Sequence, residues 1–122
     1  MLEIKNTFNV EKYREEIESL KLDPNFTLVA ESFDKEKVNG YGFYHLENGS
    51  VVIDYINDGD DILLFDGIAR SILFKALLSG INKAGFSEIQ IDKFIKLGFV
   101  QNNYKTIDSI EDFLSKCKSC GK

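Results

Sequence analysis

Residues 67–85 decide the fold and read Gly-Ile-Ala-Arg-Ser-Ile-Leu-Phe-Lys-Ala-Leu-Leu-Ser-Gly-Ile-Asn-Lys-Ala-Gly. Their apolar side chains recur with a period near 3.6, which is typical of a helix with one buried face. The pattern predicts a helix that opens near Ile68 and ends at Gly85, because glycine commonly terminates helices. The apolar positions are Ile68, Ile72, Leu73, Ala76, Leu77, Ile81 and Ala84.

Three stretches before this helix are rich in β-branched and aromatic residues: 26–33, 38–46 and 51–56. This composition is typical of strands, and the polar breaks at 34–37 and 47–50 predict hairpin turns. We therefore expect an antiparallel meander. Upstream of it, residues 2–8 favour a short strand. A helix capped by Asn9 would follow, with its apolar positions at Val10, Tyr13, Ile17 and Leu20.

Shorter elements are predicted after the long helix. Residues 87–92 alternate between apolar and polar side chains like a half-buried strand, and Phe99-Val100 begins another. Asp108 and Glu111 form a capping-box pattern ahead of a terminal helix. The order of helices and strands indicates the α+β class.

Composition places the chain among single globular domains, here residues 1–122, with 43% hydrophobic residues. A net charge of −5 and a pI of about 4.9 argue against nucleic acid and anionic membrane surfaces as partners. We find no signal-peptide pattern and no apolar run approaching the ~18 residues of a membrane span. The sequence therefore predicts a cytoplasmic protein.

Two local sequences resemble segments of the GNAT acyl-CoA N-acyltransferases. Gly67-Ile-Ala-Arg-Ser-Ile-Leu73 is similar to the end of the family's Arg/Gln-x-x-Gly-x-Gly/Ala motif and the helix after it. Phe94-Ile-Lys-Leu-Gly-Phe99 resembles the family's Tyr-x-x-Leu-Gly-Phe segment. The resemblance covers about residues 26–100. It implies a GNAT-like three-layer α/β/α fold with a mixed, largely antiparallel central sheet and two to four helices.

By this resemblance, the chain is an N-acetyltransferase that moves an acetyl group from acetyl-CoA, its cosubstrate, to a primary amine of a small molecule or peptide. Unpaired backbone N–H groups at a helix N-terminus could bind the CoA pyrophosphate. The pantetheine arm would then run between strands 51–56 and 87–92. The cofactor-binding candidates are Asp66, Gly67, Ile68, Ala69, Arg70 and Ser71.

The sequence departs from the family at several of these positions. Leu64 occupies the place of the motif's Arg or Gln, and Phe94 occupies the place of a tyrosine that can protonate the departing thiolate. Carboxylates near a pyrophosphate weaken its binding unless they are paired or point away. The approach to the helix carries four of them: Asp58, Asp60, Asp61 and Asp66. An alternative function is therefore a noncatalytic GNAT-like module that binds a ligand or a protein.

Acyl transfer to an ammonium group also needs a general base. Asp54, Glu31 and His45 are the candidates on predicted strands, and Asp54 could have a raised pKa if it is half-buried. The lone histidine is the weakest of the three. Tyr104 is a candidate for the missing proton donor, as are Tyr55 and Tyr44.

The tail at residues 117–120 is a Cys-x-x-Cys element. It could support thiol exchange or half of a zinc site, but zinc needs two more soft ligands and the chain has one His and no other Cys. We therefore predict no metal site within one chain. A metal could still bridge two copies, and a homodimer is among the assemblies we consider. For Cys117, the alternative is a small buried hydrophobe.

Overall fold

The computed structural model describes the backbone of residues 2–7, 10–101 and 105–120, and the side chains of Ile4, 10–101 and 105–115. The strands are β1 (Leu2–Thr7), β2 (Leu28–Asp34), β3 (Lys37–Glu47), β4 (Ser50–Asn57), β5 (Lys83–Phe86) and β6 (Thr106–Ile107). The α-helices are α1 (Arg14–Ser19), α2 (Ile62–Leu78), α3 (Ile91–Lys96) and α4 (Ile110–Cys120). Two short 3-10 helices, η1 (Val10–Tyr13) and η2 (Glu88–Gln90), precede α1 and α3.

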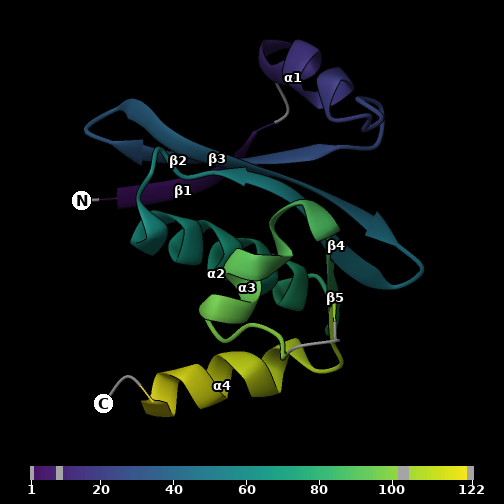
Figure 1. The fold of residues 1–122 in the computed structure, drawn as a ribbon, viewed down its shortest axis with the longest axis vertical. Coiled ribbons are helices and arrows are strands. Elements are labelled where there is room, and N and C mark those ends of the chain that lie inside the picture. Colours follow the sequence, from purple (N-terminus) through teal and green to yellow (C-terminus); the bar gives the residue numbers. More distant parts are fainter. Residues whose placement is uncertain (1, 8–9, 102–104, 121–122) are drawn as a thin grey trace.

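One sheet holds all six of these strands in the order β1-β2-β3-β4-β5-β6. The pair β4–β5 is parallel and every other neighbouring pair is antiparallel. α1 covers one face of the sheet, and α2, α3 and α4 lie on the other (Figure 1). The predicted mixed, largely antiparallel sheet inside a three-layer α/β/α fold is thus confirmed.

The predicted meander is present as β2, β3 and β4. Its two hairpin turns use residues with positive φ: Lys35 and Glu36 in the first, Asn48 and Gly49 in the second. Two consecutive residues with positive φ are typical of the type I′ turn, whose twist matches that of paired strands.

A β-bulge interrupts the pairing of β3 with β4. Phe43 lies opposite Tyr55 and the next residue, Tyr44, lies opposite Ile53, so Asp54 is an extra residue without a partner across the ladder. The bulge moves Ile56 to the same face as Ile53, where both join the core under α2. The alternation of side chains along β4 is therefore broken after Ile53.

The long helix begins at Ile62, six residues before the predicted start at Ile68. Its N-cap is Asp61, whose Oδ1 accepts hydrogen bonds from Leu63 N (3.0 Å) and Leu64 N (3.3 Å). Leu64 and Phe65 are buried and extend the apolar stripe of α2 by one turn. Sequence reasoning placed these residues in a loop because it followed the family motif rather than the aspartate cap.

The same helix ends at Leu78, and the prediction that it continues to Gly85 is wrong. Gly80 has a φ of +88°, and Ile81 N donates to Ala76 O at 2.9 Å, which is a Schellman ending. Consequently the strand after the helix is Lys83–Phe86. Residues 87–92, predicted as a strand, form η2 and the start of α3.

Two further expectations near the C-terminal end are also corrected. Phe99 and Val100 are buried in a bend rather than opening a strand, and the next strand is β6. Ser109, not Asp108, caps α4, because its Oγ accepts a hydrogen bond from Asp112 N at 3.1 Å.

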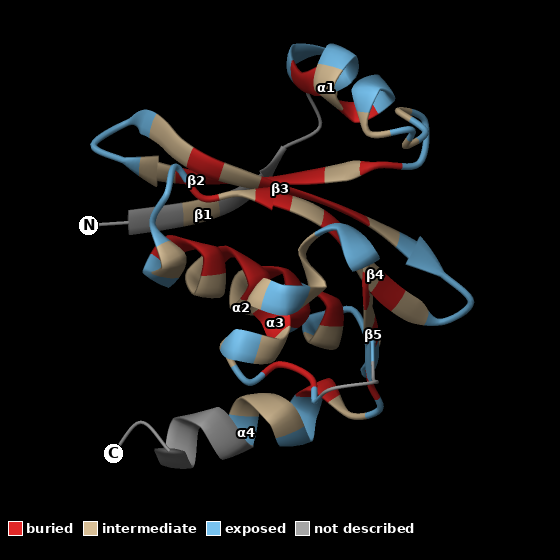
Figure 2. Ribbon diagram, in the orientation of Figure 1, coloured by how far each residue is buried: buried red, intermediate tan, exposed pale blue. Residues whose placement is uncertain are grey.

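Two apolar clusters hold the layers together. The larger one packs α2, α3 and α4 against the sheet, and buried positions line the sheet side of α2 in Figure 2. The smaller one lies under α1 and consists of Tyr13, Ile17, Val29 and Phe43. Among the described residues, no helix is long and apolar enough to cross a membrane.

Candidate functional site

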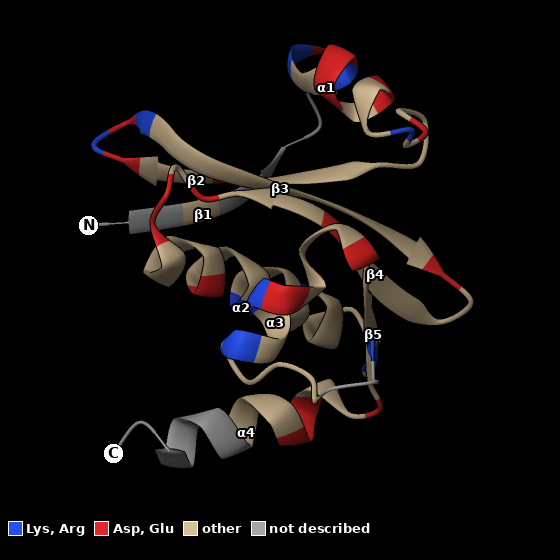
Figure 3. Cartoon of the chain, viewed as in Figure 1, with Lys and Arg blue, Asp and Glu red and all other residues tan. Residues whose placement is uncertain are grey.

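The loop between β4 and α2 is where the sequence predicted a phosphate site. Figure 3 shows that it is acidic. Its backbone donors are bonded to the chain's own oxygens: Gly59 N to Asn57 Oδ1 at 3.1 Å and Asp60 N to Asp58 Oδ1 at 3.0 Å. With Asp61 bonded to Leu63 N and Leu64 N, the N-terminus of α2 already holds a carboxylate where an anion would bind.

Asp58 is the buried member of this acidic loop. Besides accepting from Asp60 N, its other oxygen lies 3.4 Å from Lys93 Nζ on α3. The ion pair neutralises one of the four aspartates, while Asp60 and Asp61 remain exposed. The local charge therefore opposes the approach of a pyrophosphate.

The predicted cofactor-binding residues lie beyond the helix N-terminus, in the second and third turns of α2. Ile68 and Ala69 are buried in the core, and Ser71 is half-buried. A Cβ added to Gly67 would meet nothing within 4 Å, so no close backbone approach requires glycine there. Because their N–H groups belong to the interior of a helix, these residues offer no free backbone donors to a phosphate.

Arg70 is the cation predicted to contact phosphate. Its Nε donates to Asp66 Oδ2 at 2.8 Å, and its guanidinium lies 5.0 Å from the ring centres of Phe99 and Phe113. Arg70 thus joins α2 to α4 from the third turn of α2, away from the acidic loop. The observed ion pair also accounts for Asp66, which the sequence left as an unfavourable charge.

The edge of β4 that faces β5 is only partly covered by that strand. β5 pairs with Ser50 to Ile53, and Ser87 N donates to Ile53 O at 3.0 Å as the last backbone contact of this edge. Beyond it, the carboxamide of Gln90 bonds to both backbone groups of Ile56. Ile56 N donates to Gln90 Oε1 at 2.7 Å, and Gln90 Nε2 donates to Ile56 O at 2.7 Å.

The bulge brings two predicted base candidates together. His45 Nδ1 lies 2.8 Å from Asp54 Oδ2, and Asp54 is only 6% exposed. Burial raises the pKa of the Asp54 carboxyl above its ordinary value, and the hydrogen bond with His45 opposes the rise. If the ionised Asp54 accepts from Nδ1–H, the free lone pair lies on His45 Nε2, 3.8 Å from Glu47 Oε1. Such a dyad can accept a proton from an amine.

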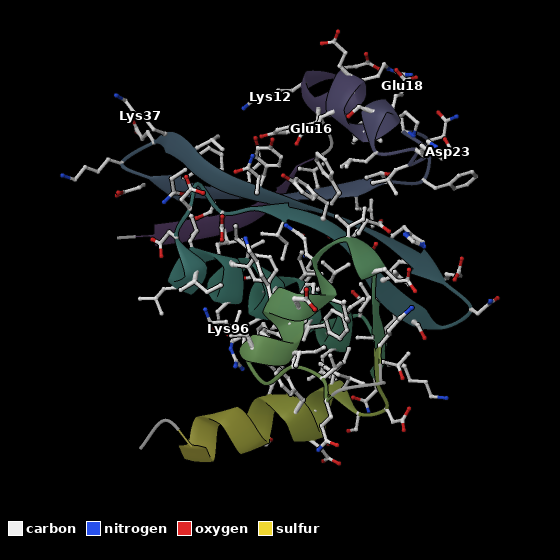
Figure 4. All side chains as sticks on the ribbon, viewed as in Figure 1. Lys12, Glu16, Glu18, Asp23, Lys37 and Lys96 are labelled. Carbon is white, nitrogen blue, oxygen red and sulfur yellow. The ribbon has the colours of Figure 1, made fainter. Side chains whose placement is uncertain are left out.

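Glu31 belongs to a different network, between β2 and η1. Its Oε2 accepts from the Tyr13 hydroxyl and from Lys12 Nζ at 3.1 Å. A parallel contact joins the Tyr41 hydroxyl to Glu16, and Figure 4 shows Glu16 on the side of α1 that faces the sheet. The carboxylates of Glu31 and Glu16 are each bonded to a tyrosine hydroxyl. These contacts hold η1 and α1 against the sheet.

Phe94, at the position of the family's tyrosine, is 1% exposed in the core. Its ring packs against Phe65, Phe86 and Phe99 at centre distances of 4.4 to 5.6 Å. Tyr104 lies outside the described residues, and so do the side chains of Cys117 and Cys120. Within the described part of the chain, no group of three His, Cys, Asp or Glu side chains could hold a metal ion.

Sequence reasoning missed Gln90, Tyr13 and the capping role of Asp61. Asp61 could have been found, because an aspartate directly before an apolar run is an N-cap signal. Gln90 and Tyr13 carry no local signal, since their partners Ile56 and Glu31 are 34 and 18 residues away.

No model of a known protein family matches the sequence, and no curated protein is similar to it. Solved structures are similar in fold. An IAA acetyltransferase from Bacillus cereus has a TM-score of 0.60 at 14% identity, with 80% of this chain and 76% of that chain covered. An acetyltransferase of the GNAT family from Staphylococcus aureus has a TM-score of 0.55 at 11% identity, with coverage of 81% and 80%.

A third similar structure contains coenzyme A. The PaiA N-acetyltransferase from Thermoplasma acidophilum, in complex with coenzyme A, has a TM-score of 0.51 at 10% identity, with 80% of this chain and 71% of that chain covered. Identities this low bear on the fold alone. They confirm the GNAT-like architecture expected from residues 67–73 and 94–99.

Proposed function

Because the chain has the GNAT fold, we propose that it is a divergent GNAT-like binding module that has lost the binding of acyl-CoA. The observation that carries this proposal is the hydrogen bonding within the segment that connects β4 to α2. Its backbone donors are bonded to the carboxylates of Asp58 and Asp61 and the amide oxygen of Asn57. A pyrophosphate would have to displace these groups and approach further negative charge.

Two other features support the same proposal. The helical turn at Ile62–Phe65 stands where the family's phosphate loop would lie, and it is anchored by two core side chains, Leu64 and Phe65. The gap between β4 and β5, where the pantetheine arm would run, is occupied at Ile56 by the Gln90 carboxamide. Both contact regions of the cofactor are thus filled by the chain itself.

A second candidate function is the N-acetyltransferase reaction with acetyl-CoA as cosubstrate. The Asp54–His45 dyad favours it, because a paired histidine can take the proton of a primary ammonium group. The amine would then attack the thioester carbonyl and form the N–C bond. Collapse of the tetrahedral intermediate would break the C–S bond, and the nitrogen would release its second proton to solvent to leave the amide. The departing thiolate would take its proton from water or from a residue other than Phe94, since a phenyl ring donates none.

Calorimetric titration of the purified, reduced protein with acetyl-CoA separates the two candidates. The binding-module proposal predicts no heat of binding at millimolar acetyl-CoA, with desulfo-CoA and adenosine diphosphate as parallel ligands. Micromolar binding that requires the pyrophosphate would overturn it and favour the acetyltransferase.

A matched pair of variants then tests the second candidate. If acetyl transfer to an amine is found, His45→Gln should lower kcat about 10²- to 10⁴-fold, the usual contribution of a general base. Gly67→Leu should leave acetyl-CoA binding unchanged, because a Cβ added at this position of α2 meets no atom within 4 Å. Loss of binding in Gly67→Leu would instead restore Gly67 as part of the cofactor site.

A further inference from the structure

The edge of β4 beyond Ile53 is a position that recognises an amide group. A strand edge offers N–H and C=O groups that a neighbouring chain can pair with. Here β5 stops pairing at Ile53, and the following chain turns away into η2 and α3. The N–H and C=O of Ile56 lie on the part of this edge that β5 does not reach, and both are bonded to the side chain of Gln90.

Gln90 presents to Ile56 the same groups that a peptide unit would. Its carboxamide supplies one acceptor and one donor, both at 2.7 Å from their partners. Addition of an extended chain to a sheet edge uses the same pair of bonds. The side chain of Gln90 therefore satisfies the backbone N–H and C=O of Ile56 as a neighbouring strand would.

Local structure holds Gln90 in this place. Ser87 N donates to Ile53 O at 3.0 Å, and Ser87 Oγ accepts from Ile89 N at 3.3 Å, which starts the 3-10 turn of η2. The turn returns the chain to β4, and Phe94 anchors the helix that follows in the core. A group tethered in this way competes at a high effective concentration against any free ligand.

We infer that Gln90 is an autoinhibitory residue, a built-in competitor that closes the open edge of β4 to extended ligands carrying secondary amides. The inference rests on the proposed function, since it explains how the gap between β4 and β5 is closed in a GNAT-like module. Removing the carboxamide opens an amide-binding site at Ile56, flanked by the Asp54 bulge and by Asp58.

Hydrogen exchange of the Ile56 amide, followed by NMR, tests the contact itself. Gln90→Ala and Gln90→Met should both speed exchange at Ile56 about tenfold or more, because each removes the acceptor of that N–H. Glu88→Ala is the matched control. Glu88 lies on the same 3-10 turn but is exposed and pairs with Lys105, so exchange at Ile56 should not change. Unchanged exchange in both Gln90 variants would overturn the inference.

Titration with pantetheine tests the closure. This probe carries secondary amides and no phosphate, so the acidic loop before α2 does not decide its binding. Gln90→Ala should bind pantetheine at least tenfold more tightly than the wild type, with shift changes at Asp54 and Ile56. Gln90→Met should stay closed, because methionine keeps the bulk of the side chain. Equal binding by wild type and Gln90→Ala would overturn the closure.

These outcomes are distinct from those of the proposed function. Wild-type protein that binds acetyl-CoA through its pyrophosphate contradicts the loss of acyl-CoA binding, whatever Ile56 does. Wild-type protein that ignores acetyl-CoA while Gln90→Ala ignores pantetheine contradicts only the role of Gln90.

Discussion

His45 and Asp54 are hydrogen-bonded because β4 has one residue more than β3 at this point. The bulge leaves Asp54 without an opposite residue, and its carboxylate reaches His45 Nδ1 at 2.8 Å. In the observed register His45 faces Val52, whereas a ladder continuing regularly from the Phe43–Tyr55 pair would place His45 opposite Ile53. The irregularity in pairing is therefore what brings Asp54 into contact with His45.

The burial of Asp54 makes the stability of the fold depend on pH. Burial raises the pKa of Asp54 above its ordinary value of 3.8, so the folded state favours the protonated carboxyl. The contribution of Asp54 to the free energy of unfolding is then complete below pH 3.8 and is lost as the pH rises through the raised value. Urea unfolding across this range should show wild type losing stability relative to Asp54→Asn.

His45 counteracts that shift, and its removal should enlarge it. NMR titration of the Asp54 carboxyl should give a higher midpoint in His45→Phe than in wild type, because the hydrogen bond that favours the carboxylate is gone. A lower or equal midpoint would mean that the dyad does not exist in solution.

The hydroxyl of Tyr13 should add to the free energy of unfolding, beyond what the burial of its aromatic ring contributes. Tyr13→Phe deprives the buried Glu31 of its phenolic donor and leaves Lys12 as a partner, so we expect a loss of about 1–3 kcal/mol in the free energy of unfolding. Tyr55→Phe is the control, since no hydrogen bond from its hydroxyl to the described residues is seen. Equal losses in chemical denaturation would contradict a specific role for the Tyr13 contact.

Two glycine-to-alanine changes should have opposite signs. In Gly40→Ala, the new Cβ would lie 2.8 Å from Leu64 Cδ2 and 2.9 Å from Asn57 O, so overpacking should destabilise the fold by about 1–3 kcal/mol.

In Gly67→Ala, the new Cβ would meet no atom within 4 Å, and the change should stabilise the fold by roughly 0.5–1 kcal/mol through helix propensity. Thermal unfolding would show both. A destabilising Gly67→Ala would mean that the helix does not begin at Ile62.

Restoring the family's tyrosine should not restore chemistry. In Phe94→Tyr the hydroxyl would enter a cluster of phenyl rings, and an unpaired buried hydroxyl costs about 1–3 kcal/mol. We expect lower stability in urea and no gain in acetyl transfer. A gain in transfer would show that position 94 faces a reacting thioester.

The strands of the meander could be predicted because their signals are local. Composition and turn residues in 28–57 are sufficient to place β2, β3 and β4 within about two residues, the usual boundary error. The helix boundaries failed where two signals competed. At the C-terminal end, Gly85 was predicted to end the helix, but Gly80 adopts the left-handed conformation that ends it. At the N-terminal end, the interpretation of Gly67 as part of the family motif drew attention away from the N-cap at Asp61.

The candidate site could be predicted only in part. Asp54 and His45 were both proposed as bases, yet their contact depends on a bulge that alternation cannot reveal. Gln90 could not be predicted, since its role depends on where β5 leaves β4. Long-range contacts of this kind are set by the register of strands, which the sequence of either partner alone does not contain.

The order of the sheet has a consequence for how the chain folds. Every strand pairs with its neighbour in sequence, so β1 to β4 can assemble by successive antiparallel additions with modest loop closure. The parallel pair β4–β5 is different, because it forms only after the whole of α2 has crossed the sheet. We therefore expect the meander to be structured early in refolding, and the rate to be limited by closure of the β4–α2–β5 crossover.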